Sequence, residues 1–354
     1  MKILFACHGA GNGGAERIIT TLANEFYKRK YQVVLITTKE KHNDYQLEDG
    51  IKHFRVIVNS SSKVSEAIQR LKQMRIIIKS ERPDCIISFS TVTNLQILIS
   101  SSFLRIKTIV SERVDPSRYP TSKIRRILRI ALYPTADKII FQTKDAMDYF
   151  PNMIKKKGDI IPNPIRDGLP LPYSGERENI VVGVGSLGEQ KNWTMALSAC
   201  RLFFEQKPEY KLIIYGEGPL REELQSEIDN DEILKNRVIL AGFADNVVDR
   251  IRSSRMYISS SNYEGISNSM LEALAIGLPT ICTDCPTGGA KSVIVSGQNG
   301  FLVEVEDHVD MAEKMLLLAN NDDLCDTFSE NSVHIRNTLK LDTIVDLWEK
   351  EVLG

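Results

Sequence analysis

The chain has 354 residues, of which 42% are hydrophobic and 26% charged, and its formal net charge is −1. This composition is typical of a globular protein of two domains and excludes a low-complexity or disordered chain. No apolar run approaches the roughly 18 residues that a membrane-spanning helix needs. The six scattered cysteines exclude a dense disulfide scaffold and predict a reducing, cytoplasmic location.

Segments typical of strands and of helices alternate along the whole chain. In the first half we expect helices at 15–30, 64–80 and 123–132 and strands at 2–7, 32–37, 85–89, 108–111 and 138–142. In the second half we expect helices at 194–206, 220–229 and 247–254 and strands at 180–184, 210–215, 237–241, 256–259 and 280–283. Short, continuous strands rich in Ile and Val predict parallel sheets buried on both faces. The alternation predicts an α/β fold, doubly wound, in each half.

A segment rich in Pro and Gly at 161–179 predicts a linker between two similar domains. We expect an N-terminal domain over 1–165 and a C-terminal domain over 166–335. Residues 336–354 are expected to form a C-terminal helix that packs back toward the first domain.

The two halves carry opposite charge. Residues 1–170 hold 29 Lys+Arg against 16 Asp+Glu, and residues 171–354 hold the remaining 16 against 30. A basic half favours phosphates, nucleic acid or an anionic membrane surface as its partner. Attraction between the two halves is the alternative explanation.

Two glycine-rich turns fit the pattern G-x-G-x-x-G, at 9–14 and at 183–188, and the first opens the first expected helix. Glu40, beyond the second strand, stands where a ribose-binding acid would lie. Glycine turns let the backbone approach a phosphate, but they also relieve crowding at any turn from strand to helix. A phosphate-binding turn is therefore the prediction, and a nicotinamide cofactor is a remote alternative.

The expected helix at 123–132 is basic and amphipathic. Isoleucine and leucine recur at helical spacing among lysine and arginine residues. Such a helix can lie in a membrane interface or pack on its own sheet, and both interpretations stay open.

Lys191 lies between a strand and a helix at the carboxyl edge of the second expected sheet, where ligands of open α/β sheets bind. A lysine there can neutralise a leaving diphosphate, or it can be an ordinary solvated side chain. The turn Gly216-Glu-Gly-Pro219 follows the next strand, with Pro219 suited to a first helical turn. This turn is either a wall against a nucleotide base or a simple tight turn.

Glu264 and Glu272 flank the expected start of another helix. Ser267 or Asn268 can cap this helix, and Gly277 can end it. The start of a helix is a natural phosphate site, and carboxylates on either side of it can accept hydrogen bonds from sugar hydroxyls. The segment predicts a site for a phosphorylated sugar or a nucleotide that carries one. No metal site is expected, because the pair Cys282 and Cys285 lacks a second pair or a nearby histidine.

Together and in order, these segments resemble the family 4 retaining glycosyltransferases. Their fold is GT-B, in which two Rossmann-like, doubly wound parallel-sheet domains face a central cleft. The resemblance covers nearly the whole chain and is carried by residues 13–17, 185–192, 215–220, 264–275 and 299–303. The E-x7-E pattern from Glu264 to Glu272 is the more specific part.

The resemblance implies transfer of a sugar from a nucleotide donor with retention of configuration, without a protein nucleophile. It implies that Glu264 contacts donor-sugar hydroxyls, Glu272 contacts the ribose and Lys191 neutralises the diphosphate. The remaining donor-binding residues are expected to be Gly13, Gly14, Arg17, Ser186, Gly216, Gly218, Pro219, Gly265, Ile266, Ser267 and Asn268. Neither a tightly bound cofactor nor a metal is expected.

Two positions depart from the family pattern. Ser186 stands where many members carry an arginine, so Arg17 or Arg113 is expected to assist Lys191. Glu112 stands where many members carry a histidine, and we expect it to serve as a catalytic residue in its place. The stretch 111–116 resembles a subgroup that builds bacterial surface glycans, often from UDP-N-acetylhexosamines.

We therefore expect a glycosyltransferase that moves a sugar, of the N-acetylhexosamine class, from a UDP-sugar to a glycan or polyprenyl-linked saccharide acceptor. It is expected in the cytoplasm, at the inner face of the plasma membrane, with its basic domain against anionic lipid and with no nucleic-acid partner. The alternatives are a sugar-nucleotide epimerase of the same architecture and a non-catalytic nucleotide-sugar-binding protein.

Overall fold

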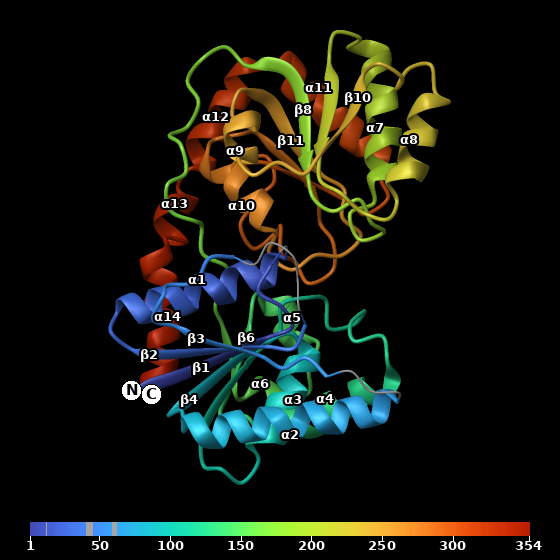
Figure 1. Ribbon diagram of the computed structural model, residues 1–354. Helices are drawn as coiled ribbons and strands as arrows, with labels where there is room; N and C mark the ends of the chain where they lie inside the picture. Colours follow the sequence, from blue (N-terminus) through green and yellow to red (C-terminus); the bar gives the residue numbers. More distant parts are fainter. Residues whose placement is uncertain (12, 40–44, 59–61) are drawn as a thin grey trace. The chain divides into compact units, whose positions relative to one another are not determined.

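The structure, a computed structural model, describes residues 1–354 except 12, 40–44 and 59–61. Glu40, the expected ribose-binding acid, lies outside the described residues. The chain divides into two compact units: unit 1 is Met1–Asn163 with Asp342–Gly354, and unit 2 is Pro164–Leu341. Each unit is built around its own parallel sheet (Figure 1). The prediction of two doubly wound α/β units is confirmed.

The sheet of unit 1 has seven parallel strands within the described residues, in the order β3-β2-β1-β4-β5-β6-β7. The strands are β1 (Lys2–Cys7), β2 (Gln32–Thr37), β3 (Lys52–Arg55), β4 (Cys85–Phe89), β5 (Lys107–Ser111), β6 (Lys138–Phe141) and β7 (Gly158–Ile160). The order reverses between β1 and β4, and ligands of open α/β sheets bind beyond the carboxyl ends of such strands.

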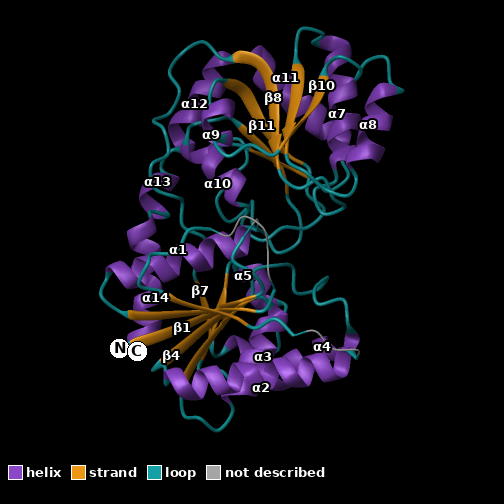
Figure 2. Ribbon diagram, in the orientation of Figure 1, coloured by secondary structure: helices purple, strands orange, loops and turns teal. Residues whose placement is uncertain are grey.

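Helices cover both faces of this sheet (Figure 2). They are α1 (Gly14–Lys28), α2 (Lys63–Glu81), α3 (Thr91–Ser101), α4 (Lys123–Leu132), the 3₁₀ turn η1 (Tyr133–Thr135), α5 (Lys144–Asp148), α6 (Asn152–Lys155) and α14 (Leu341–Leu353). Although α14 ends the chain, it belongs to unit 1: Trp348 is fully buried, and Glu349 accepts a hydrogen bond from Arg29 at 2.6 Å.

The sheet of unit 2 has six parallel strands in the order β10-β9-β8-β11-β12-β13, all of them described. They are β8 (Glu178–Val184), β9 (Lys211–Tyr215), β10 (Val238–Gly242), β11 (Ser254–Ser259), β12 (Thr280–Thr283) and β13 (Phe301–Val303). The order reverses between β8 and β11, so the loops after these two strands lie beside each other.

The helices of unit 2 also lie on both faces of its sheet (Figure 2). They are α7 (Trp193–Gln206), α8 (Arg221–Asp229), α9 (Val247–Ile251), α10 (Asn268–Ala275), α11 (His308–Asn320), α12 (Asp322–Ser332) and α13 (Ile335–Thr338). The helix expected over 247–254 stops at Ile251, because β11 begins at Ser254. Pro219 lies before α8 rather than in its first turn.

The amphipathic helix α4 contacts α3, but Ile124 and Ile127 remain 71% and 69% exposed. Packing within unit 1 therefore does not bury these two apolar side chains. None of the helices in the described part of the chain is both long and apolar enough to cross a membrane.

Candidate functional site

The loops at the carboxyl edge of the unit 2 sheet pack backbone against backbone. A Cβ atom on Gly216 would lie 1.9 Å from the carbonyl oxygen of Gly185, and Gly216 has φ of +152°. A Cβ atom on Gly289 would lie 1.8 Å from the carbonyl oxygen of Gly265. Only glycine allows approaches this close. The loops after β8 and β9, and those after β11 and β12, are thereby held together in pairs at the edge where a ligand of this fold binds.

Lys191 and Glu264 meet in this cluster of loops. The Lys191 Nζ forms an ion pair with Glu264 Oε2, and Gln190 Nε2 donates to Glu264 Oε1 at 3.2 Å. The two charged side chains are only 11% and 20% exposed. The structure thus joins two residues that the sequence indicated separately. Gln190 was missed, because an amide beside a lysine carries no distinctive pattern.

Hydrogen bonds between the two loops fix this pair. Ser260 Oγ donates to the Lys191 carbonyl at 2.8 Å, and the Asn262 backbone N–H donates to the Gln190 carbonyl at 2.9 Å. Asn192 caps α7 by accepting from the Met195 N–H at 3.2 Å, and its amide donates to the Asn262 side chain at 2.8 Å. The ion pair therefore lies on a backbone that is anchored to both β8 and β11.

Glu272 lies on α10, one turn after the helix begins at Asn268. Its side chain is 6% exposed, and its Oε1 lies 3.5 Å from the Arg166 Nε. Arg166 belongs to the segment that enters unit 2, and its pairing with Glu272 was not predicted. The structure thus places Glu264 before α10 and Glu272 inside it, as expected.

Ser267 occupies the cap position of α10, but its side chain makes no capping hydrogen bond among the described residues. Of the two expected caps, Ser267 or Asn268, Ser267 holds the cap position, but the expected side-chain hydrogen bond from it is not formed within the described part of the chain. Its hydroxyl lies 3.0 Å from Ser269 Oγ, which donates to the Val184 carbonyl at 3.1 Å and lies 3.0 Å from the Tyr257 hydroxyl. These hydroxyls join the start of α10 to the ends of β8 and β11. Ile266, in the preceding turn, is buried.

The remaining expected residues of unit 2 lie along the same edge. Ser186 is exposed, and its carbonyl accepts from Trp193 Nε1 at 3.0 Å. Gly218 packs on the Leu187 backbone, where a Cβ atom would be 2.3 Å from the carbonyl oxygen, and Pro219 is exposed. Ser186 adds no charge here, so among the expected donor-binding residues of unit 2 the positive charge comes from Lys191.

In unit 1, Gly13 and Gly14 begin α1 after β1. Gly13 is the cap residue, and its carbonyl accepts from the Arg17 N–H at 2.9 Å. Arg17 is half-buried in the first turn. The glycine turn is therefore located at the carboxyl edge of the unit 1 sheet, as its sequence position predicts.

Glu112 follows β5 and is 1% exposed. Thr91 Oγ1 lies 3.0 Å from both carboxylate oxygens, and the Tyr133 hydroxyl donates to Oε1. Burial raises the pKa of the Glu112 carboxyl above its ordinary value, against the opposing effects of Arg129 and these hydrogen bonds. Glu112 thus lies in the interior of unit 1, and its catalytic role stays a prediction.

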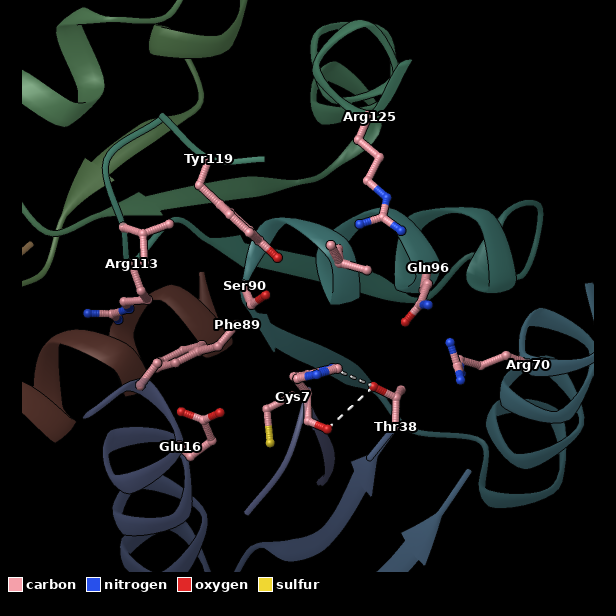
Figure 3. A pocket seen from close by; sticks show the side chains of 14 residues that line it. Cys7, Glu16, Thr38, Arg70, Phe89, Ser90, Gln96, Arg113, Tyr119 and Arg125 are labelled. Atoms are coloured by element: carbon pink, nitrogen blue, oxygen red, sulfur yellow. Dashed lines mark hydrogen bonds between the residues drawn. The ribbon is translucent and has the colours of Figure 1, made fainter. Parts of the chain in front are cut away.

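A cavity of about 440 Å³ opens at the carboxyl ends of β1 and β4 in unit 1 (Figure 3). Among its described lining residues are Cys7, Phe89, Ser90, Gln96, Arg113 and Tyr119, and Glu112 is not one of them. The sequence did not predict this cavity, because its wall combines single residues from many separate elements.

Arg113 lines this cavity while being only 7% exposed. Its guanidinium lies 4.3 Å from the Phe89 ring centre, and its Nη1 donates to Asn163 Oδ1 at 3.1 Å. Its Nε and Nη2 have no hydrogen-bond partner among the described residues. Burial lowers the pKa of Arg113 to about 9.

No group of His, Cys, Asp or Glu side chains arranged to hold a metal ion occurs among the described residues. The expectation that no metal is required stays a prediction.

Two family models match the chain. Residues 12–168 match "Glycosyltransferase Family 4", and residues 173–334 match "Glycosyl transferases group 1". The chain is 27% identical, over 99% of its own length and 98% of the relative, to a Campylobacter jejuni protein named GalNAc-alpha-(1->4)-GalNAc-alpha-(1->3)-diNAcBac-PP-undecaprenol alpha-1,4-N-acetyl-D-galactosaminyltransferase. A second C. jejuni relative, an N-acetylgalactosamine-N,N'-diacetylbacillosaminyl-diphospho-undecaprenol 4-alpha-N-acetylgalactosaminyltransferase, is 27% identical over 91% of each chain.

Among solved structures, HepE from Anabaena, in complex with UDP and glucose, matches the whole of both chains with a TM-score of 0.85 at 16% identity. This likeness shows the shared fold. The predicted fold class and family are confirmed by these comparisons.

Proposed function

Because the chain belongs to the family 4 glycosyltransferases of GT-B fold, we propose that it is a retaining enzyme that uses a UDP-sugar donor. Its acceptor is a polyprenyl-linked saccharide of a bacterial surface glycan. The names of both C. jejuni relatives support this acceptor class, because each contains an undecaprenyl-diphosphate saccharide. The epimerase alternative loses support, since both relatives are named as transferases.

The ion pair between Lys191 and Glu264 carries the donor part of the proposal. It places a cation and a carboxylate side by side, just before the start of α10, with Glu272 one turn further along. A cation and a helix start suit a diphosphate, and carboxylates suit the hydroxyls of a sugar and of a ribose. A sugar, a diphosphate and a ribose are the groups of a nucleotide sugar.

In the proposed reaction, the bond between the sugar C1 and the diphosphate oxygen breaks as an acceptor hydroxyl attacks C1 on the same face. The hydroxyl proton passes to the departing phosphate oxygen, so no protein nucleophile is needed. Lys191 stabilises the charge that develops on the diphosphate, as a preorganised cation does in a poorly solvated site. Glu264 fixes both the lysine and the donor sugar.

Location at the inner face of the plasma membrane is also part of the proposal. The exposed Ile124 and Ile127 on α4 stand beside Lys123 and Arg125, which favours contact with an anionic lipid surface. The polyprenyl chain of the proposed acceptor would place the reaction at such a surface.

The proposal is tested by incubating the protein with UDP-sugars and a synthetic undecaprenyl-diphosphate saccharide. Stoichiometric UDP release that requires the acceptor, with an α-linked product from an α-linked donor by nuclear magnetic resonance, is the expected result. An inverted product would refute retention, and release of another nucleotide would refute the UDP donor. Normal turnover by Glu264→Ala would refute the donor site.

A further inference from the structure

The unit 1 cavity has a cationic side that the proposed donor chemistry does not use. Arg70 from α2, Gln96 from α3 and Arg125 from α4 all line it. Figure 3 shows the two guanidinium groups extending toward Gln96 from different helices. Three flexible polar side chains from three elements thus converge on one part of the cavity.

Polar atoms of these three side chains remain without hydrogen-bond partners among the described residues. The Arg125 side chain makes no hydrogen bond or ion pair with any described residue. Arg70 pairs with Glu66 through Nη2, but its Nε is buried and has no partner among the described residues. The same holds for Gln96 Oε1. Buried polar atoms are normally hydrogen-bonded, so the unpartnered atoms of Arg70 and Gln96 are better explained by a ligand than by the fold. Arg125 is exposed at the cavity wall, so its charge is available to the same ligand.

The rest of the lining fits an anionic saccharide. Of the described lining residues, three are arginines and one, Glu16, is acidic, which leaves the cavity with an excess of positive charge. Tyr119 supplies an apolar ring, and Ser90 supplies a hydroxyl. A volume of about 440 Å³ is within the range of small-molecule sites.

We propose that this cavity binds the acceptor through an oxyanion, held by Arg70, Gln96 and Arg125, and that the enzyme therefore selects acidic acceptors over neutral ones. The inference rests on the proposed function in taking the ligand to be the acceptor. Guanidinium groups match the geometry of phosphate and carboxylate oxygens better than any other side chain. The oxyanion has two possible sources: the diphosphate of a lipid carrier, or an acidic group within the glycan.

The test measures binding of three probes by calorimetry: geranyl diphosphate, octyl β-D-glucuronide and the neutral octyl β-D-glucoside. The full chain is used with UDP at saturation, so that the donor site does not bind the diphosphate probe. The variant Arg70→Gln/Arg125→Gln removes the two cations. The matched control Lys72→Gln/Lys123→Gln removes two exposed charges from the same two helices, outside the cavity lining.

We expect at least one acidic probe to bind tenfold more tightly than the glucoside, and the arginine variant to lose at least tenfold of that affinity. The lysine control should stay within twofold. Preference for geranyl diphosphate identifies the lipid carrier, and preference for the glucuronide identifies an acidic sugar. Equal binding of all three probes, or an equal loss in the control, would overturn the proposal.

UDP binding is measured in each variant by thermal shift, and melting curves confirm that each variant folds. Unchanged UDP binding in the arginine variant is expected, because the proposed donor residues lie in unit 2. A loss of UDP binding there would assign these arginines to the donor and overturn the acceptor site. Failure of the unsubstituted protein to bind UDP would instead contradict the proposed function, and the probe titrations without UDP would still report on the cavity.

Discussion

Replacing Lys191 with methionine tests the pair on which the donor site depends. The change keeps the length of the side chain and removes its charge, which leaves Glu264 without its cation. Because the two side chains are 11% and 20% exposed, water screens the pair only weakly. Breaking a fully buried pair costs about 3–5 kcal/mol, so we expect the free energy of unfolding to fall by about 2 kcal/mol at this partly open site.

The same substitution should lower kcat far more than the stability change alone explains. Loss of one preorganised group that stabilises developing charge lowers kcat by about 10²- to 10³-fold. The assay is UDP release at saturating donor and acceptor, with unfolding followed separately in urea. Glu264→Gln and the double variant complete a cycle, which should give a coupling energy of about 1–2 kcal/mol for contacting residues.

Two results would refute this reasoning. A kcat within fivefold of the unsubstituted enzyme would show that Lys191 does not stabilise the leaving diphosphate. Additive losses of stability in the cycle would show that the ion pair is not a significant interaction in solution. Gln190, which also donates to Glu264, should keep the carboxylate partly satisfied in Lys191→Met.

Three further predictions follow from other parts of the chain. Gly216→Ala should lower the free energy of unfolding, measured in urea, by about 2–3 kcal/mol, because the added Cβ would lie 1.9 Å from the Gly185 carbonyl oxygen. The control Gly188→Ala, whose Cβ would enter open space, should change it by less than about 1 kcal/mol. Equal effects of the two substitutions would contradict the close packing at Gly216. The raised pKa of buried Glu112 means that the folded state binds its proton more tightly than the unfolded state does, so the stability it contributes is present at low pH and lost as pH rises above its ordinary pKa. Glu112→Gln should remove the fall in stability that begins as the pH rises above 4.5. Parallel curves of stability against pH for the two proteins would contradict this prediction. Ile124→Ser/Ile127→Ser should weaken cosedimentation with anionic vesicles at an unchanged melting temperature, since both side chains are exposed; undiminished cosedimentation would exclude α4 as the contact.

The elements that the sequence predicted correctly are those with strong local signals. Strands β1, β2, β4 and β12 have the predicted bounds, because each is a short apolar run between polar turns. Helix α3 was missed because most of its residues are buried and it has no polar face to give a helical period. Strands β3 and β7 were missed because they are short, exposed edge strands without an apolar pattern.

The residues of the candidate site were likewise predictable only where a local sequence signal marks them. Glu264, Lys191 and Glu272 could be located from their sequence positions, because the ends of strands and the starts of helices fix where such residues lie. Their partners Gln190 and Arg166 could not, because side-chain pairing depends on loops that meet only after folding. The unit 1 cavity was missed for the same reason, since its arginines come from two helices and the loop after β5, with no common motif.

The position of α14 has a consequence for biosynthesis. Unit 1 combines Met1–Asn163 with Asp342–Gly354, so Trp348 reaches its core only after the whole of unit 2 has been translated. Unit 2 is continuous and can fold while residues 342–354 are still being made, as domains generally do. A nascent or truncated chain that lacks the last thirteen residues would expose the face of unit 1 that Trp348 covers. Such a chain is therefore a natural target for chaperones and proteases, and a deletion within Asp342–Gly354 should be poorly tolerated.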